Sequence, residues 1–306
     1  MKFENLLDKR EQMQVELLRR LIQTNGRTSI QKLALDCNIS RPSLDTYLQS
    51  LEDLGSQMGK SISISRLEND VVLELDKRLS FNEIVEFLLL DATKYRFMRL
   101  LLENQELNMI DLSEKLLVSE STLFRKIKEL NHDLKEFNLQ IKNNKLIGNE
   151  EQIRYFYFLL FNGVQKGKRP AYLLRTEEKT KFILHAEESL RLSFSEVNKD
   201  QISCWMGIAE QRNKFTAIKK EFLLAQKQIY QNDHLYQLLD SLFYQEIYQN
   251  SDINHCETML FYSFCVSFFI LNQEDDYRFN IFRSKQIPAV MLNVTIREKM
   301  LAHYHI

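Results

Sequence analysis

One pattern of residues occurs twice in this chain, once over residues 33–51 and once over residues 112–130. A serine, Ser40 or Ser119, stands in the middle of each copy, and leucine or isoleucine follows at spacings of three and four. Serine is a preferred N-cap, because its hydroxyl accepts a hydrogen bond from the first turn of a helix. The spacing leaves one face of that helix polar. Each copy therefore predicts two helices joined by a tight turn, a helix-turn-helix. The aligned pairs are Ala34 with Ser113, Ile39 with Val118, Ser43 with Thr122, Leu44 with Leu123, Leu48 with Ile127 and Leu51 with Leu130.

The second helix of each copy is the expected DNA-contacting element, because in a helix-turn-helix this helix lies in the major groove. Arginine and lysine bind guanine edges or phosphates, and serine and threonine bind either. The first copy is less basic than the second, and Asp45 adds a negative charge there. The candidate DNA-contacting residues on these helices are Arg41, Ser43, Thr46, Ser121, Thr122, Arg125, Lys126 and Lys128.

Each copy is followed by a predicted β-hairpin. Alternating residues on both sides of Asn69-Asp70 indicate the first hairpin, and L-Q-I-K and K-L-I-G on both sides of Asn143-Asn144 indicate the second. A hairpin in this position is the wing of a winged helix-turn-helix. Wings often contact phosphates beside the major-groove helix, so Lys142 and Lys145 are candidate backbone contacts.

Composition favours a mainly α fold, since 306 residues include only seven glycines and three prolines. From residue 171 onward the apolar spacing is helical throughout. We predict two tandem winged helix-turn-helix domains followed by an all-helical bundle. The expected boundaries are 1–78 for the first winged domain, 79–150 for the second, 151–170 for a linker, 171–285 for the helical domain and 286–306 for the start of a further helical segment.

Charge and cysteine content limit the function classes. The formal net charge is −1, so any nucleic-acid surface must be local. Four cysteines and six histidines show no metal-site spacing, and no cofactor or catalytic motif is present. The apolar run Met259–Leu271 is too short to span a bilayer and is interpreted as a core helix or a dimer face. We expect a cytoplasmic protein that uses no cofactor or metal and contacts no membrane.

Three segments, residues 39–48, 116–131 and 139–156, together resemble the Mga/AtxA-like transcription regulators of Gram-positive bacteria. The likeness covers most of residues 1–270. It implies promoter DNA as a partner, activation of transcription, and helical domains similar to phosphotransferase-system regulation domains, which mediate homodimerisation. In several members of that family such domains are phosphorylated on histidine by the sugar phosphotransferase system. On this basis His185 and His255 are candidate phosphorylation sites, and phosphocarrier proteins are candidate partners.

Other classes of protein share part of this pattern. A plasmid-type replication initiator also carries tandem winged helices, but such a chain is usually more basic than this one. An enzyme with a DNA-binding head would need a cluster of catalytic residue types, which the sequence lacks. A pure scaffold would bind no DNA, and a gel-shift assay would distinguish it.

Overall fold

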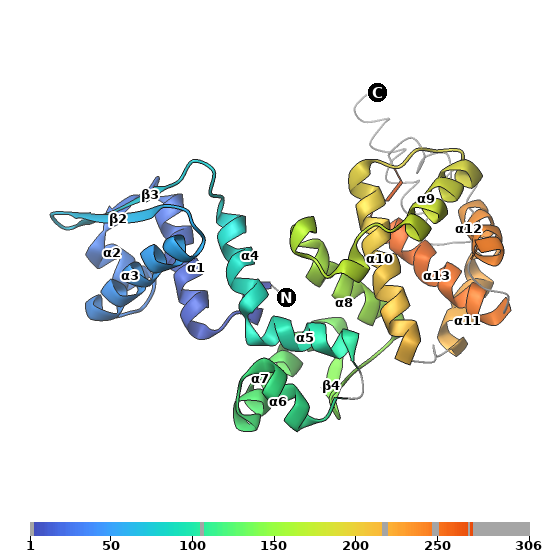
Figure 1. Cartoon of the computed structure of the whole chain (residues 1–306), viewed down its shortest axis with the longest axis horizontal. Coiled ribbons are helices and arrows are strands. Elements are labelled where there is room, and N and C mark those ends of the chain that lie inside the picture. Colours follow the sequence, from blue (N-terminus) through green and yellow to red (C-terminus); the bar gives the residue numbers. More distant parts are fainter. Residues whose placement is uncertain (1–2, 105–106, 216–219, 247–250, 269, 272–306) are drawn as a thin grey trace, which may run out of the picture. The chain divides into compact units, whose positions relative to one another are not determined.

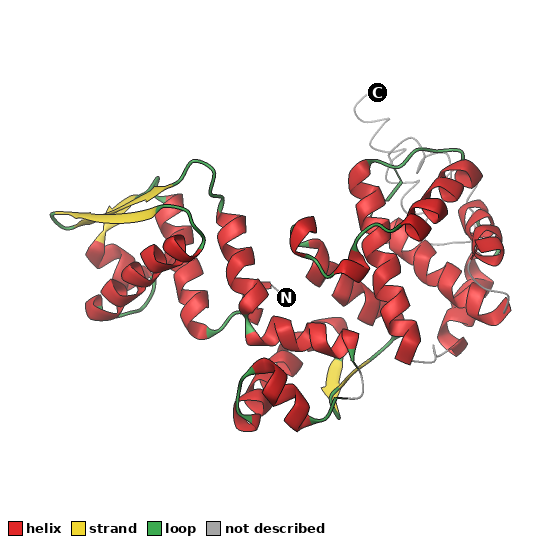
Figure 2. Ribbon diagram, viewed as in Figure 1, coloured by secondary structure: helices red, strands yellow, loops and turns green. Residues whose placement is uncertain are grey.

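The structure, a computed structural model, describes residues 3–104, 107–215, 220–246, 251–268, 270 and 271 (Figure 1). The chain divides into two compact units, Met1–Ile147 and Gly148–Ile306. Helices predominate in both (Figure 2), which confirms the predicted mainly α fold. The expected segment 286–306, with His303 and His305, lies outside the described residues.

The first helix-turn-helix forms where the sequence predicts it, in the first half of the N-terminal unit. Its helices are α1 (Lys9–Gln23), α2 (Ile30–Asp36) and α3 (Arg41–Gln57), preceded by the 3-10 turn η1 (Phe3–Leu6). The hairpin β2 (Ile62–Leu67) and β3 (Asp70–Leu75) follows, with its turn at Glu68-Asn69, one residue earlier than expected. A short strand β1 (Arg27–Ser29), which the sequence did not predict, pairs with β3 and gives the antiparallel order β1-β3-β2.

The second helix-turn-helix repeats this plan with a smaller wing. Its elements are α4 (Phe81–Asp91), α5 (Thr93–Glu103), α6 (Met109–Leu116), α7 (Glu120–Asp133), the 3-10 turn η2 (Leu134–Phe137), β4 (Gln140–Lys142) and β5 (Lys145–Ile147). Asn143 and Asn144 both have positive φ, 49° and 56°. Two consecutive positive φ values are what a two-residue hairpin turn requires, and asparagine tolerates them better than most residues do.

The two copies share their capping bonds. The hydroxyl of Ser40 accepts a hydrogen bond from the Ser43 N–H (3.3 Å), and that of Ser119 accepts one from the Thr122 N–H (3.2 Å). Both serines are therefore the N-caps that the sequence predicts. Pro42 lies in the first turn of α3, where a missing N–H costs no helical hydrogen bond.

The turn between the two helices is also the same in both copies. Asn38 and Leu117 occupy aligned positions, and both are left-handed, with φ of 52° and 58°. Asparagine adopts this conformation with little strain, whereas a leucine in it brings its Cβ close to a carbonyl oxygen. Leu117 is also 85% exposed, so no burial of its side chain offsets this strain.

The helical unit contains α8 (Glu150–Asn162), α9 (Glu177–Leu190), α10 (Glu196–Phe215), α11 (Lys220–Tyr230), α12 (His234–Glu246) and α13 (Ser251–Ser267), with 3-10 turns η3 (Lys166–Lys168) and η4 (Ala171–Leu173). The sequence placed a linker at 151–170, but α8 is a core helix of this unit. Phe156, Phe158 and Phe161 are fully buried. Burial of large aromatic side chains stabilises a fold, so a helix that carries several of them packs in the core instead of forming an exposed linker.

A buried arginine joins three helices of this unit. The guanidinium of Arg154 on α8 binds both carboxylate oxygens of Glu257 on α13 (2.6 and 2.7 Å) and the carboxylate of Glu150 (3.0 Å). Arg212 on α10 also binds Glu150 (2.8 Å). Burial alone would lower the pKa of Arg154, but the two carboxylates outweigh this effect and raise it. Arg154 therefore stays charged inside the unit.

The apolar run near the end of the described chain is mostly core. Met259, Leu260, Phe261 and Phe264 of α13 are buried within the unit. Of the two interpretations of this run, the core helix is the one that the structure supports. None of the helices in the described ranges combines the length and apolar character needed to cross a membrane.

The strain at Leu117 can be tested by exchanging the turn residues of the two copies. We expect Leu117→Asn to increase the free energy of unfolding by about 1 kcal/mol, because it relieves the left-handed leucine. The matched variant, Asn38→Leu, should decrease it by a similar amount. Guanidinium denaturation of both variants measures these changes. A loss of stability in Leu117→Asn would contradict the argument.

Candidate nucleic-acid interface

The outer face of α7 presents polar, basic and aromatic side chains. Ser121, Arg125 and Lys128 are exposed, and Thr122 is half-buried, with its hydroxyl 2.9 Å from that of Ser119. Between them Phe124 is 58% exposed. Phe124 therefore adds one large apolar group to an otherwise polar helix face. This surface suits a partner with both acceptor groups and apolar edges.

Lys126 does not belong to this face, contrary to the sequence expectation. It is buried, and its ammonium group pairs with the carboxylate of Asp8 at the start of α1. The physical reason is helical periodicity, since Lys126 lies three residues after Leu123 and four before Leu130 on the core side of α7. Its long stem packs among apolar groups while its charge reaches a carboxylate.

A second buried lysine reinforces this connection. The ammonium of Lys94 on α5 binds the Glu129 carboxylate of α7 (2.8 Å) and the carbonyl oxygen of Asn5 (2.9 Å). The hydrogen bond from Lys94 holds the pKa of Glu129 below its usual value. Lys94 and Lys126 therefore bind α7 to the N-terminal segment that leads into the first helix-turn-helix.

The wing of the second copy carries both predicted lysines. Lys142 and Lys145 are exposed and lie directly opposite each other across β4 and β5. Two adjacent ammonium groups repel each other unless an anion lies between them or close by. The tip of this wing is therefore a small positive surface.

The wing is fixed to α7 by a residue that the sequence analysis did not single out. The side-chain amide of Asn131 accepts a hydrogen bond from the Ile141 N–H (2.6 Å) and donates one to the Ile141 carbonyl (3.0 Å). In the first copy the aligned residue of α3 is Glu52, whose carboxylate accepts a bond from the Ile64 N–H of β2 (2.9 Å). Both positions therefore anchor a wing strand to its helix. Asparagine and glutamate have different side chains, so the sequence alignment gave no signal of this shared role.

The α3 face is less available to an anionic partner. Arg41 is exposed and Ser43 is half-buried, but the Thr46 hydroxyl donates to the Pro42 carbonyl (3.1 Å). Asp45 forms an ion pair with Arg66 of β2 (2.6 Å). This pair neutralises the wing arginine that lies nearest to α3, whereas the aligned position in α7 is the uncharged Phe124.

A comparison with known protein families identifies the second copy. Residues 77–161 match the family model described as the Mga helix-turn-helix domain. This part of the chain is similar to the Mga helix-turn-helix domain and is called the Mga domain for that similarity. The match spans α4 to α8, so the Mga domain includes the first helix of the helical unit. No curated protein matches the chain.

The family match confirms the resemblance to Mga-like regulators over this segment. It indicates a DNA-binding transcriptional regulator. Within the Mga domain, the candidate residues Ser121, Arg125 and Lys128 lie on the exposed side of α7, and Lys142 and Lys145 lie on the wing. Only Lys126 among the candidates of this domain is turned inward.

The anchoring of the wings gives a prediction for both copies. Replacing Asn131 with alanine leaves the Ile141 N–H without its partner and should cost about 1–3 kcal/mol locally. We expect faster hydrogen exchange at Ile141 in Asn131→Ala and at Ile64 in Glu52→Ala, each without an effect on the other wing. Exchange measured by NMR distinguishes the two sites. Unchanged protection at Ile141 would show that the strand pairing alone holds the wing.

Proposed function

We propose that this chain regulates transcription by inserting α7 of its Mga domain into the major groove of promoter DNA. The observation that carries the proposal is the exposed face of a Ser119-capped helix beside an anchored, basic wing. The Arg125 guanidinium suits the paired acceptors of a guanine edge, and Ser121 suits a base or a phosphate. Phe124 adds an apolar contact of the kind that thymine methyl groups accept.

Phosphate contacts come from the remaining basic residues of the Mga domain. Lys128 on α7 and Lys142 and Lys145 on the wing are exposed point charges, which bind the DNA backbone without selecting a sequence. Lys126 takes no part, because its charge is already paired with Asp8. These contacts position the helix, and Ser121 and Arg125 select the bases.

The first helix-turn-helix supplies a second, weaker DNA contact. Arg41 at the start of α3 is exposed, and Ser43 keeps a hydroxyl that can bind a phosphate. Thr46 contributes through its partly engaged hydroxyl. The Asp45–Arg66 pair removes charge from this face, so we assign most of the binding free energy to the Mga domain.

We further propose that the chain acts as an activator and as a homodimer. The resemblance to Mga-like regulators supports both parts. On the described surface of the helical unit, Phe222 and Ile229 of α11 are exposed and lie seven residues apart, on one side of that helix. A dimer that covers them would remove two large apolar groups from water. Light scattering of the purified chain tests this part, and a monomer mass at every concentration would contradict it.

His255 is the better supported of the two candidate phosphorylation sites. Its Nδ1 donates to the Asp240 carboxylate (2.8 Å), which connects α13 to α12. A carboxylate at Nδ1 fixes the tautomer and leaves Nε2 as the basic, nucleophilic nitrogen. A phosphoryl group there would add negative charge close to Asp240 and weaken the contact between the two helices. His185 on α9 is half-buried and remains the second candidate.

DNA binding by α7 is testable with one substitution. Arg125→Ala should weaken binding to target DNA and lower the dependence of log K on log salt by about one unit if Arg125 contacts a phosphate. If it binds a guanine instead, the loss should be about 1–3 kcal/mol and confined to the specific site. The control, Lys181→Ala, removes the same charge from an exposed pair in the helical unit. Unchanged binding in Arg125→Ala would contradict the assigned face.

Phosphorylation is testable with a reconstituted phosphotransfer system. The chain is incubated with phosphoenolpyruvate, the general phosphotransferase enzyme and its histidine phosphocarrier protein. We expect an acid-labile phosphoryl group that is lost in His255→Ala and kept in His185→Ala. A label that persists in His255→Ala would contradict the assignment. Promoter-reporter expression with the same variants then gives the sign of regulation.

A further inference from the structure

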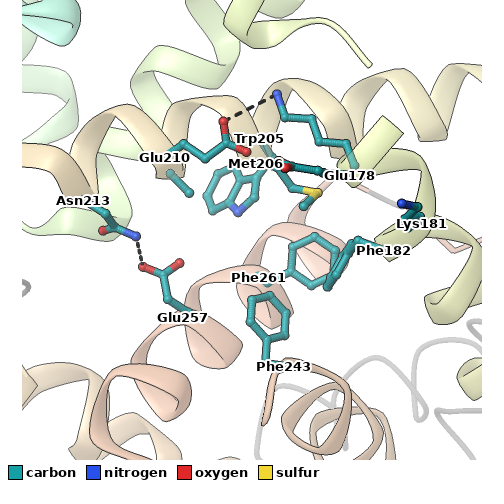
Figure 3. Close-up of a pocket in the computed structure, with 12 residues that line it drawn as sticks. Glu178, Lys181, Phe182, Trp205, Met206, Glu210, Asn213, Phe243, Glu257 and Phe261 are labelled. Atoms are coloured by element: carbon teal, nitrogen blue, oxygen red, sulfur yellow. Dashed lines mark hydrogen bonds and ion pairs between the residues drawn. The ribbon is translucent and has the colours of Figure 1, made fainter. Parts of the chain in front are cut away.

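A cavity of about 430 Å³, partly open to the surface, lies in the helical unit. Figure 3 shows Trp205, Met206 and Glu210 of α10 on one side of it and Phe182 and Phe261, from α9 and α13, on the other. Pockets of roughly 300–1,000 Å³ bury most of the surface of a small organic ligand. The size and the aromatic lining of this cavity are those of a ligand site.

The apolar wall of the cavity is rigidly built. Phe182, Phe243 and Phe261 contact one another, with ring centroids 5.4, 5.8 and 5.5 Å apart. On the opposite side Trp205 stacks on Phe264, with centroids 4.5 Å apart. Because each ring is held by another ring, the walls need little reorganisation to accept a flat or branched apolar group.

The two lysine ammonium groups at the cavity already have partners within the protein. Lys179 is buried, donates to the carbonyl oxygens of Tyr172 and Leu174, and lies 3.8 Å from Glu210. Lys181 is exposed and pairs with Glu177 (3.1 Å). Their donors are directed at protein groups, so the cavity offers little to an anionic ligand.

The carboxylates at the cavity differ in how well positive or donor groups of the protein neutralise them. Glu257 is bound by Arg154 and by the side-chain amide of Asn213 (2.9 Å). Glu178 and Glu210 line the same cavity as Lys179 and Lys181, and the Lys179 ammonium lies 3.8 Å from the Glu210 carboxylate. Partial burial raises the pKa of Glu210, and repulsion from Glu178 adds to this effect, whereas the attraction of Lys179 and Lys214 opposes it without cancelling it. An additional positive charge between these two carboxylates would relieve their repulsion.

We propose that this cavity binds a small organic cation with an aromatic or branched apolar body. The apolar body lies between Trp205 and the phenylalanine cluster, and the ammonium group meets Glu178 and Glu210. Aromatic faces attract cations as well as apolar groups, so the lining favours both ends of such a molecule. The ligand would contact α9, α10, α12 and α13 together, and its binding would stabilise the folded helical unit by mass action. This site lies outside the DNA-contacting surfaces and does not depend on the proposed function.

The chain contains a direct reporter of this site, because Trp205 is its single tryptophan. The full chain is titrated with 2-phenylethylammonium, with the neutral 2-phenylethanol and with the anionic 3-phenylpropionate, while tryptophan fluorescence is recorded. We expect saturable changes and an affinity for the ammonium about tenfold higher than for the alcohol, since an ion pair adds to the apolar contact. The carboxylate should bind most weakly.

Two variants test the role of the charges. Glu210→Gln and Glu178→Gln should each lower the affinity for 2-phenylethylammonium several-fold, up to about tenfold, and leave that for 2-phenylethanol unchanged. The matched control is Glu188→Gln, an exposed residue of α9 that does not line the cavity. Thermal unfolding by circular dichroism verifies that the variants fold. Glu178 and Glu210 are both exposed, so either variant is expected to fold, and each tests the role of the charges independently of the other.

Three results would overturn the proposal. These are the absence of a saturable fluorescence change with any probe, binding of 3-phenylpropionate as tight as that of the ammonium, and an equal loss of alcohol and ammonium binding in the folded charge variants. The assay contains no DNA, so its outcome is separate from the outcome of the Arg125→Ala experiment.

Discussion

The fully buried charge of Arg154 is the constraint on which the helical unit depends. A guanidinium without water must have its charge and its donors satisfied by the protein, and here Glu150, Glu257 and Asn213 satisfy them. These partners come from α8, α10 and α13, so the three helices must assemble together or leave a buried charge unpaired. Because α8 ends the segment that matches the Mga domain, the family match itself reaches into the core of this unit.

The N-terminal unit uses one local arrangement twice and then modifies it. A serine N-cap, a left-handed turn residue and a helix residue that anchors the wing recur at aligned positions. What differs is the charge on the outer face. An Asp45–Arg66 pair neutralises the first copy, whereas Phe124 and Arg125 leave the second open to a partner. The two copies therefore share a backbone plan, but the outer face of the second is better suited to an anionic partner than that of the first.

Local signals in the sequence predicted most of this fold, because each has a local physical cause. Ser119 caps α7 through a bond to its own first turn, and Asn143-Asn144 sets the wing turn through its φ preference. Interactions between distant residues were not predictable in this way. Lys126 was expected on the outer face, since nothing near it in the sequence identifies Asp8 as its partner. The same holds for the core position of α8 and for a cavity whose walls come from four helices.

The bonds from Lys94 and Lys126 to the N-terminal segment have a geometric consequence for any duplex that contacts both α3 and α7. They resist a change in the separation of the two helices, so such a duplex would have to match a fixed separation between its two contact sites. Successive faces of B-DNA recur about every 10–10.5 base pairs. A target would therefore have to present its two contact sites in a defined helical phase, and spacing as well as base identity would distinguish it from other DNA.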